Sequence, residues 1–206
     1  RKMYHVRLIY NTNFSRTKFK DIDVFELWNK FDSVSVGASL DAEWDRAELM
    51  RKGTKWEETV ENRKRMMQVC PQVDFYISST VGLANSLHVC DFHKSWVEQG
   101  LIKPQDFNFN LLQHPTWQRM DILPPEFKQQ VKEKYDTHIK WIATQDHLTR
   151  ATKGYQSALD WMFKTDNQKH LDNFFSQTRR YDKIRDENFI DIFPEWKDLF
   201  DKYEKN

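Results

Sequence analysis

Hydrophobic and polar residues alternate from residue 33 to residue 41, and this period of two predicts a strand with one apolar face. The apolar face carries Val34, Val36, Ala38 and Leu40. The other face carries small polar residues and ends in the carboxylate of Asp41. Small side chains leave space, so this face is either the wall of a cavity or the solvent side of an ordinary half-exposed strand.

Three further segments have a strand pattern, at residues 5–10, 73–80 and 106–112, and amphipathic helical patterns separate the four segments. Asp23 and Thr54 each precede a helical pattern with a glutamate three residues later, which is typical of a capping box. Strands that alternate with helices indicate an α/β fold with about four parallel strands. We interpret them as part of an open β/α barrel.

Polar residues gather where the predicted strands end. Ligands of parallel α/β sheets bind at the carboxyl ends of the strands, and strands covered on both faces are usually apolar throughout. The polar set at these ends is Asn11, Asn13, Ser39, Asp41, Ser78, Thr80, Asn110 and His114. Because all four strands share this bias, the pattern favours the wall of a barrel around a ligand.

The last third of the chain is helical in pattern, and it begins at Pro124–Pro125, since proline is favoured in the first turn of a helix. We therefore expect a β/α segment at residues 1–122 and a helical C-terminal extension at 123–206, packed together as one globular unit. The sequence has 15 Phe and 8 Trp but only 5 Gly, which suits a well-packed core.

Composition narrows the setting of this 206-residue chain. The net charge of +1 indicates neither nucleic acid nor an anionic membrane as a partner. The 2 cysteines, Cys70 and Cys90, form no metal-binding or disulfide pattern, so we expect a reducing, cytoplasmic setting. The chain begins at Arg1 and enters a strand pattern almost at once, so we expect a fragment of a longer protein.

Two groups of residues are candidates for chemistry. His88, Cys90, Asp91 and His93 crowd at a helix start, where capping and packing are a simpler explanation than a metal. Arg51 follows the first-described strand and suits a ligand carboxylate, because its planar guanidinium binds carboxylates bidentately. The alternative for Arg51 is a surface ion pair with Glu48 or Glu57. The hydrolase, zinc-protease and P-loop motifs are missing.

The stretch VSVGASLDAEWDRAELMRKGTKWEETVENRKRMMQ resembles the fifth strand and following helix of radical S-adenosylmethionine enzymes. Their pattern is a strand ending in Ser-Leu-Asp, then Arg-x-Gly, then a helical Asn. Here these are Ser39-Leu40-Asp41, Arg51-Lys52-Gly53 and Asn62. YNTN at residues 10–13 and ISSTVGLANSLHV at residues 77–89 resemble neighbouring strand ends. The tail at residues 173–196 is similar to the end of the twitch-domain subgroup.

The resemblance implies a role for several of these residues. S-adenosylmethionine would bind to Asn11, Asn13, Ser39, Asp41, Arg51, Thr80 and Val81. Asn110 and His114 would shape the substrate pocket, and the alternative for His114 is an ordinary loop histidine after the fourth strand. The family's CxxxCxxC motif, which binds a [4Fe–4S] cluster, is missing here, so the resemblance places the cluster only in a preceding part of the protein. No metal site and no catalytic residue is assigned within this chain.

The leading hypothesis is therefore the C-terminal part of a radical S-adenosylmethionine enzyme, which supplies part of the cofactor and substrate pocket for 5′-deoxyadenosyl radical chemistry. Its partners would be the N-terminal remainder of the protein and a peptide or nucleotide-like substrate, and the chain alone would be inactive. The alternative is a non-catalytic binding module with a degenerate barrel, whose aromatic helical tail contacts another protein.

Overall fold

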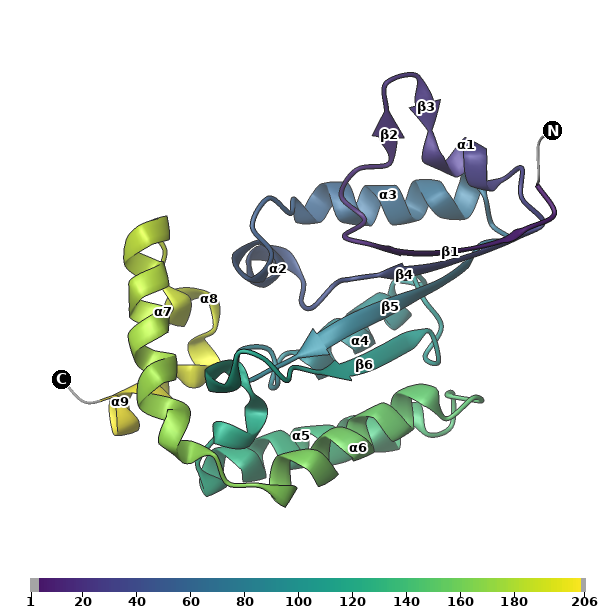
Figure 1. Cartoon of the computed structure of the whole chain (residues 1–206). Coiled ribbons are helices and arrows are strands. Elements are labelled where there is room, and N and C mark those ends of the chain that lie inside the picture. Colours follow the sequence, from purple (N-terminus) through teal and green to yellow (C-terminus); the bar gives the residue numbers. More distant parts are fainter. Residues whose placement is uncertain (1–3, 205–206) are drawn as a thin grey trace.

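A computed structural model describes residues 4–204 of the protein, and a parallel sheet forms the centre of this region. Its strands are β1 (Arg7–Thr12), β4 (Ser33–Ala38), β5 (Asp74–Val81) and β6 (Phe107–Leu111). All neighbouring strands run parallel, and their order in the sheet follows their order in the chain (Figure 1). The expected α/β fold class is confirmed.

Short helices connect these strands. They are α1 (Val24–Trp28), α2 (Trp44–Met50), α3 (Trp56–Val69) and α4 (Val89–Glu98). The side chain of Asp23 caps α1 as expected, by accepting hydrogen bonds from the amides of Phe25 and Glu26. A small hairpin that the sequence pattern missed, β2 (Lys18–Phe19) and β3 (Ile22–Asp23), precedes this helix.

The predicted cap at Thr54 is wrong. Helix α3 begins one residue later than that cap requires, with Lys55 at the N-cap position and no side-chain cap bond. The carboxylate of Glu48, on α2, instead accepts a hydrogen bond from the amide of Trp56 at 3.0 Å. A neighbouring helix therefore satisfies an amide that a local capping residue would otherwise serve.

The helices cover a single face of the sheet. This face is apolar: Val36 of β4 pairs in register with Phe75 of β5, and Ile77 pairs with Phe107 of β6. All four side chains are buried. Trp28 of α1 lies against the β1 residue next to Val36, with 5.4 Å between its ring and that of Tyr10.

The other face of the sheet is polar and open. Ser35 of β4 lies opposite Asp74 of β5, Gly37 lies opposite Tyr76, and Thr80 lies opposite Asn110 of β6. Ile9 of β1 belongs to the same face and is 65% exposed, which is unusual for a large aliphatic side chain in a sheet. Parallel sheets are normally covered on both sides, so this uncovered polar face is the feature that distinguishes the fold.

The C-terminal region is helical, as the sequence predicts. Its helices are α5 (Pro125–Ile142), α6 (Arg150–Lys164), α7 (Leu171–Arg185), α8 (Phe189–Ile192) and α9 (Lys197–Tyr203). The 3₁₀ turns η1 (Thr116–Gln118), η2 (Met120–Ile122), η3 (Gln168–His170) and η4 (Pro194–Trp196) link them. None of the helices among residues 4–204 is long and apolar enough to cross a bilayer.

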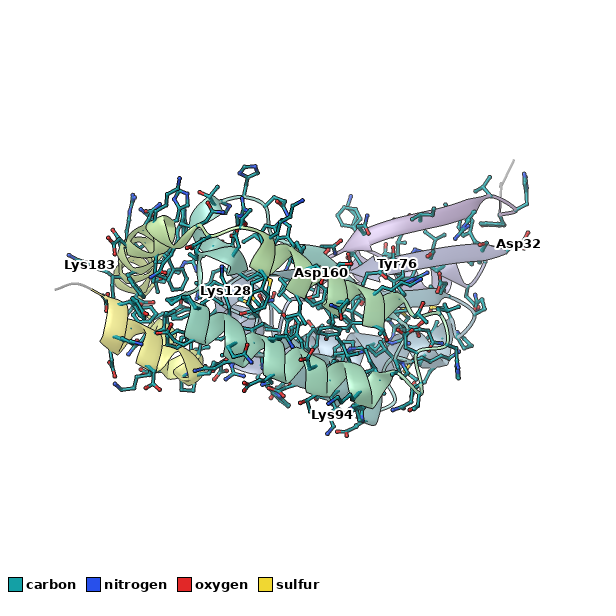
Figure 2. The ribbon with its side chains drawn as sticks, turned by 90° about the horizontal axis from the view of Figure 1, so that it is seen from below. Asp32, Tyr76, Lys94, Lys128, Asp160 and Lys183 are labelled. Atoms are coloured by element: carbon teal, nitrogen blue, oxygen red, sulfur yellow. The ribbon has the colours of Figure 1, made fainter. Side chains whose placement is uncertain are left out.

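These helices divide into two groups. Helix α6 packs closely on β6, because a Cβ atom at Gly154 would lie only 2.7 Å from the Cβ of Phe109. Helices α7 to α9 lie beyond the carboxyl ends of the strands (Figure 1). Figure 2 shows Lys183 of α7 and Asp32, which precedes β4, at opposite ends of the molecule. Helices α7 to α9 therefore lie at the end of the sheet where a ligand is expected.

A buried set of polar rings joins α4, α5 and α6, and we call His93, His138 and Tyr155 the histidine cluster. The Nε2 of His93 donates to the carbonyl oxygen of Pro104 at 3.0 Å, so its Nδ1 is an acceptor. The Nε2 of His138 donates to that Nδ1 at 3.0 Å, and the Tyr155 hydroxyl lies 3.3 Å from it. Burial lowers the pKa values of both histidines to about 3.

Candidate functional site

Asp41 connects the ends of two strands at the carboxyl edge of the sheet. It follows β4 and is 7% exposed. Its Oδ1 accepts a hydrogen bond from the amide of Thr80, in β5, at 2.7 Å. Its Oδ2 accepts a hydrogen bond from the Nε of Arg51 at 2.7 Å, within an ion pair. We call Asp41, Arg51, Thr80 and Asn85 the Asp41 cluster.

Asn85 is the member of this cluster that the sequence prediction missed. It lies in the turn between β5 and α4 and is fully buried. Its Nδ2 donates to the carbonyl oxygens of Asp41 at 2.8 Å and Thr80 at 3.1 Å, and its Oδ1 accepts from the amide of Gly82 at 2.9 Å. The only signal in the sequence is one amide side chain within the otherwise apolar run VGLAN.

Arg51 ends helix α2 as its C-cap residue, and Asp41 holds its guanidinium through one nitrogen only. Neither Glu48 nor Glu57, the alternative partners expected from the sequence, pairs with it: Glu48 binds the amide of Trp56. Within residues 4–204, nothing bonds to Nη1 or Nη2 of Arg51, and 35% of its side chain is exposed. The outer edge of the guanidinium is thus oriented and free to bind an anion.

A cavity of about 280 Å³ lies beside the Asp41 cluster. Asp41, Thr80 and Asn85 form its wall on the side of the sheet. The other walls come from α2, the turn η1, α7, the α7–α8 loop and the first residue of α8. They include the side chains of Leu49, Met50, Trp117, Gln118, Phe174, Thr178, Tyr181, Asp182, Arg185, Glu187 and Phe189.

The charges around this cavity are mostly balanced. Lys52 forms an ion pair with Glu187, and Asp182 lies 4.0 Å from the Nη1 of Arg179. Burial raises the pKa of Asp182, although its Oδ1 accepts a hydrogen bond from the amide of Phe189 at 3.1 Å. The three carboxylates that line the cavity, those of Asp41, Asp182 and Glu187, therefore each lie near a cation.

Four further cofactor residues predicted from the sequence form no side-chain hydrogen bond with the Asp41 cluster within the described residues. Asn11 lies on the open face, where its Oδ1 would be 2.7 Å from a Cβ at Gly37. The side chain of Asn13 accepts hydrogen bonds from the amide and hydroxyl of Ser15, within its own turn. The amide of Ser39 bonds to the carbonyl of Thr12 at 2.7 Å. Val81 is fully buried on the helix-covered face.

The two substrate residues predicted from the sequence are both exposed. The Nδ2 of Asn110 donates to the hydroxyl of Ser78 at 3.0 Å and to the carbonyl of Ser79 at 3.2 Å, so it lies over β5 on the open face. His114 precedes Pro115 through a cis peptide bond in the segment leading to η1. Neither residue lines the cavity beside Asp41.

A second, partly buried polar group binds α8 and η4 to α2. Arg46 of α2 donates from Nη1 to the Nδ1 of His88 at 2.6 Å, from Nη2 to Glu195 at 2.9 Å, and from Nε to the carbonyl of Ile192 at 2.9 Å. Burial lowers the pKa of His88 to about 3 and raises that of Glu43 to about 7. These bonds hold α8 and η4 against α2, so they help to position Phe189 of α8 in the cavity wall.

The cysteines do not fit a [4Fe–4S] cluster. Cys70 and Cys90 are free and buried, and burial raises both of their pKa values, whereas cluster ligands are thiolates. Among residues 4–204, no three His, Cys, Asp or Glu side chains are arranged to hold a metal ion. His88 and His93 instead belong to separate hydrogen-bonded groups, with Arg46 and with His138.

Comparison with protein-family models gives no match for this chain, and comparisons with curated proteins and with solved structures give no significant match. Function therefore has to be argued from the Asp41 cluster, the cavity and the sequence resemblance.

Proposed function

We propose that the chain is the C-terminal part of a radical S-adenosylmethionine enzyme and supplies part of the S-adenosylmethionine pocket. The observation that carries this proposal is Arg51, whose guanidinium is oriented by Asp41 and keeps Nη1 and Nη2 free of partners within the described part of the chain. The methionyl carboxylate of the cofactor is a planar anion that such an edge binds with two parallel hydrogen bonds.

The surroundings of Arg51 suit the rest of such a ligand. The pair lies at the carboxyl edge of a parallel sheet, where ligands of α/β proteins bind. Beside it are the polar open face and a cavity of about 280 Å³ with both apolar and polar walls. That volume is below the roughly 300–1,000 Å³ of typical ligand pockets, so we expect it to enclose part of a cofactor and substrate assembly rather than all of it.

In this proposal the residues of the chain bind and orient, and they do not themselves supply electrons. When bound, the [4Fe–4S] cluster would supply the reducing electron, and its ligands would belong to a part of the protein that precedes residue 1, because the two cysteines here are buried. Asp41 would fix the orientation of Arg51, and Asn85 would fix the position of Asp41.

The open side of the sheet suits such a preceding part. β1 pairs only with β4 within the described residues, so one of its edges has no strand beside it. Its face carries Ile9, which is 65% exposed. We propose that further strands pair with this edge and complete the pocket, in a reducing, cytoplasmic setting where Cys70 and Cys90 stay free.

Calorimetric titration of the 206-residue chain with three ligands tests the role of Arg51. S-adenosylmethionine and S-adenosylhomocysteine carry the methionyl carboxylate, whereas 5′-methylthioadenosine lacks it. We expect Arg51→Ala to weaken the first two about tenfold or more and to leave the third unchanged, because only the carboxylate loses a charge-assisted pair. Because this proposal assigns part of the pocket to a preceding segment, wild-type affinity should itself be weak.

Arg16→Ala is the matched control, because Arg16 is an exposed arginine outside the Asp41 cluster. The Arg16→Ala variant should bind all three ligands as the wild type does. The proposal is wrong if the chain binds none of the three ligands. It is also wrong if Arg51→Ala weakens 5′-methylthioadenosine as much as S-adenosylmethionine.

A further inference from the structure

Two aromatic rings line the side of the cavity that η1 and α7 form. Trp117 of η1 and Tyr181 of α7 both line it, with 6.2 Å between their ring centroids and 36° between their planes. Tyr181 is 38% exposed. A planar ligand ring can stack on the ring of Trp117 or on that of Tyr181. Such stacking of a nucleobase contributes about 1–3 kcal/mol per base to the binding free energy.

Arg185, one turn further along α7, adds a cation to these rings. Its guanidinium lies over the ring of Tyr181, 4.9 Å from the centroid, and Nη1 makes a long bond of 3.4 Å to the carbonyl of Leu49. No carboxylate of the described residues lies within ion-pair distance of it, and its Nε and Nη2 donate no hydrogen bond there. Arg185 is therefore an arginine with free donors in the cavity wall, separate from Arg51, which binds Asp41 and does not itself line the cavity.

We propose that this side of the cavity binds a nucleotide, with its base against Trp117 and Tyr181 and its phosphate on Arg185. The aromatic pair favours a flat ring, and the free donors of an arginine favour a phosphate, which it binds bidentately. The volume of about 280 Å³ suits a single-ring base better than a large ligand. Thr80, Thr178 and Gln118 offer further hydrogen-bonding groups in the same walls.

The inference rests on the proposed function in one respect, because it names the nucleotide as the substrate of the same site. Binding itself is independent of S-adenosylmethionine and can be measured alone. The two arginines also separate the two ligands: Arg51 contacts Asp41 at the end of the sheet, and Arg185 of α7 contacts Tyr181 of the same helix and the carbonyl of Leu49 of α2.

The test is calorimetric titration of the 206-residue chain with uridine 5′-monophosphate and with uridine. We expect the monophosphate to bind the wild type more tightly than the nucleoside. Arg185→Gln should weaken the monophosphate about tenfold and leave uridine unchanged, because one charge-assisted contact is lost. Tyr181→Leu should weaken both ligands, because the ring against which the base stacks is lost.

Arg51→Ala serves as the crossed control: it should leave uridine 5′-monophosphate binding unchanged, and Arg185→Gln should leave S-adenosylhomocysteine binding unchanged. Binding of uridine and its monophosphate with equal affinity overturns the inference, as does an Arg185→Gln variant with wild-type affinity or a chain that binds neither ligand. A chain that binds S-adenosylmethionine but not the nucleotide overturns the inference alone. The reverse result overturns the proposed function alone.

Discussion

The histidine cluster and the Asp41 cluster are both networks of buried polar groups, but they differ in what is left unpaired. In the histidine cluster, His93 uses both ring nitrogens, one toward Pro104 and the other toward His138. In the Asp41 cluster, Asn85 and Asp41 are equally well bonded, yet Arg51 has two free nitrogens at the surface of the network.

The difference separates a structural network from a binding one. A network whose members all have partners inside the protein stabilises the fold, because removing one member leaves the others buried and unpaired. A network that holds one charged group in place but leaves its outer donors free is preorganised for a ligand. Substitutions in the histidine cluster should therefore lower stability alone, whereas substitutions in the Asp41 cluster should lower ligand binding, with a loss of stability that depends on how deeply the residue is buried.

The largest expected effect on stability is that of His93→Ala. It removes a ring that is completely buried and leaves His138 and the Pro104 carbonyl without a partner. We expect a loss of about 3–5 kcal/mol in the free energy of unfolding, measured by urea denaturation. Arg51→Ala should cost less in the same assay, about 1–2 kcal/mol, since Arg51 is partly exposed and Asp41 keeps its hydrogen bond from the amide of Thr80. A loss below 1 kcal/mol for His93→Ala would contradict the comparison.

Asn85→Ala should lower both stability and ligand binding, with a smaller loss of stability than His93→Ala. It leaves the carbonyls of Asp41 and Thr80 and the amide of Gly82 without their buried partner, so we expect a loss of about 2–3 kcal/mol. It should also weaken S-adenosylhomocysteine binding, because Asp41 then orients Arg51 less well. Thr59→Ala, at a buried residue of α3 outside the cluster, is the control that should leave binding intact. Wild-type binding by a folded Asn85→Ala variant would contradict a positioning role.

The smallest expected effect per residue is the dependence of stability on pH, because a single histidine contributes no more than about 1.4 kcal/mol per pH unit. The pKa values of His88, His93 and His138 are lowered from 6.5 to about 3 by burial, so the unfolded chain binds more protons below pH 6.5. Stability should thus be fully present above pH 6.5 and fall as the pH decreases, by up to about 1.4 kcal/mol per pH unit for each histidine.

Glu43 acts in the opposite direction. Burial raises its pKa from 4.5 to about 7, so its contribution is present below pH 4.5 and is lost as the pH rises through 7. Urea denaturation of the Glu43→Gln variant between pH 5 and 8 removes this contribution and isolates that of the histidines. A variant that loses no stability between pH 6.5 and pH 5 would show that the histidines are not buried in neutral form.

The local pattern of apolar and polar residues is sufficient to predict strands, which alternate, and helices, which have an amphipathic repeat. The four strands, the Asp23 cap and the helical C-terminal region follow from which residues are apolar and at what spacing. The polar face was also visible, because the side chains of a strand alternate between its two faces whatever the strand packs against. Asp41 and Thr80 lie together, as their places at the carboxyl ends of parallel strands predict.

Only the tertiary structure decided the partners of these residues. Arg51 pairs with Asp41 rather than with Glu48 or Glu57, because the end of α2 turns back toward β4. Trp117, Tyr181 and Arg185 meet at the cavity although they lie far from Asp41 in the sequence. Sequence spacing determines which side chains share a face of one element, whereas contacts between elements depend on how the whole chain packs, and no local pattern encodes that.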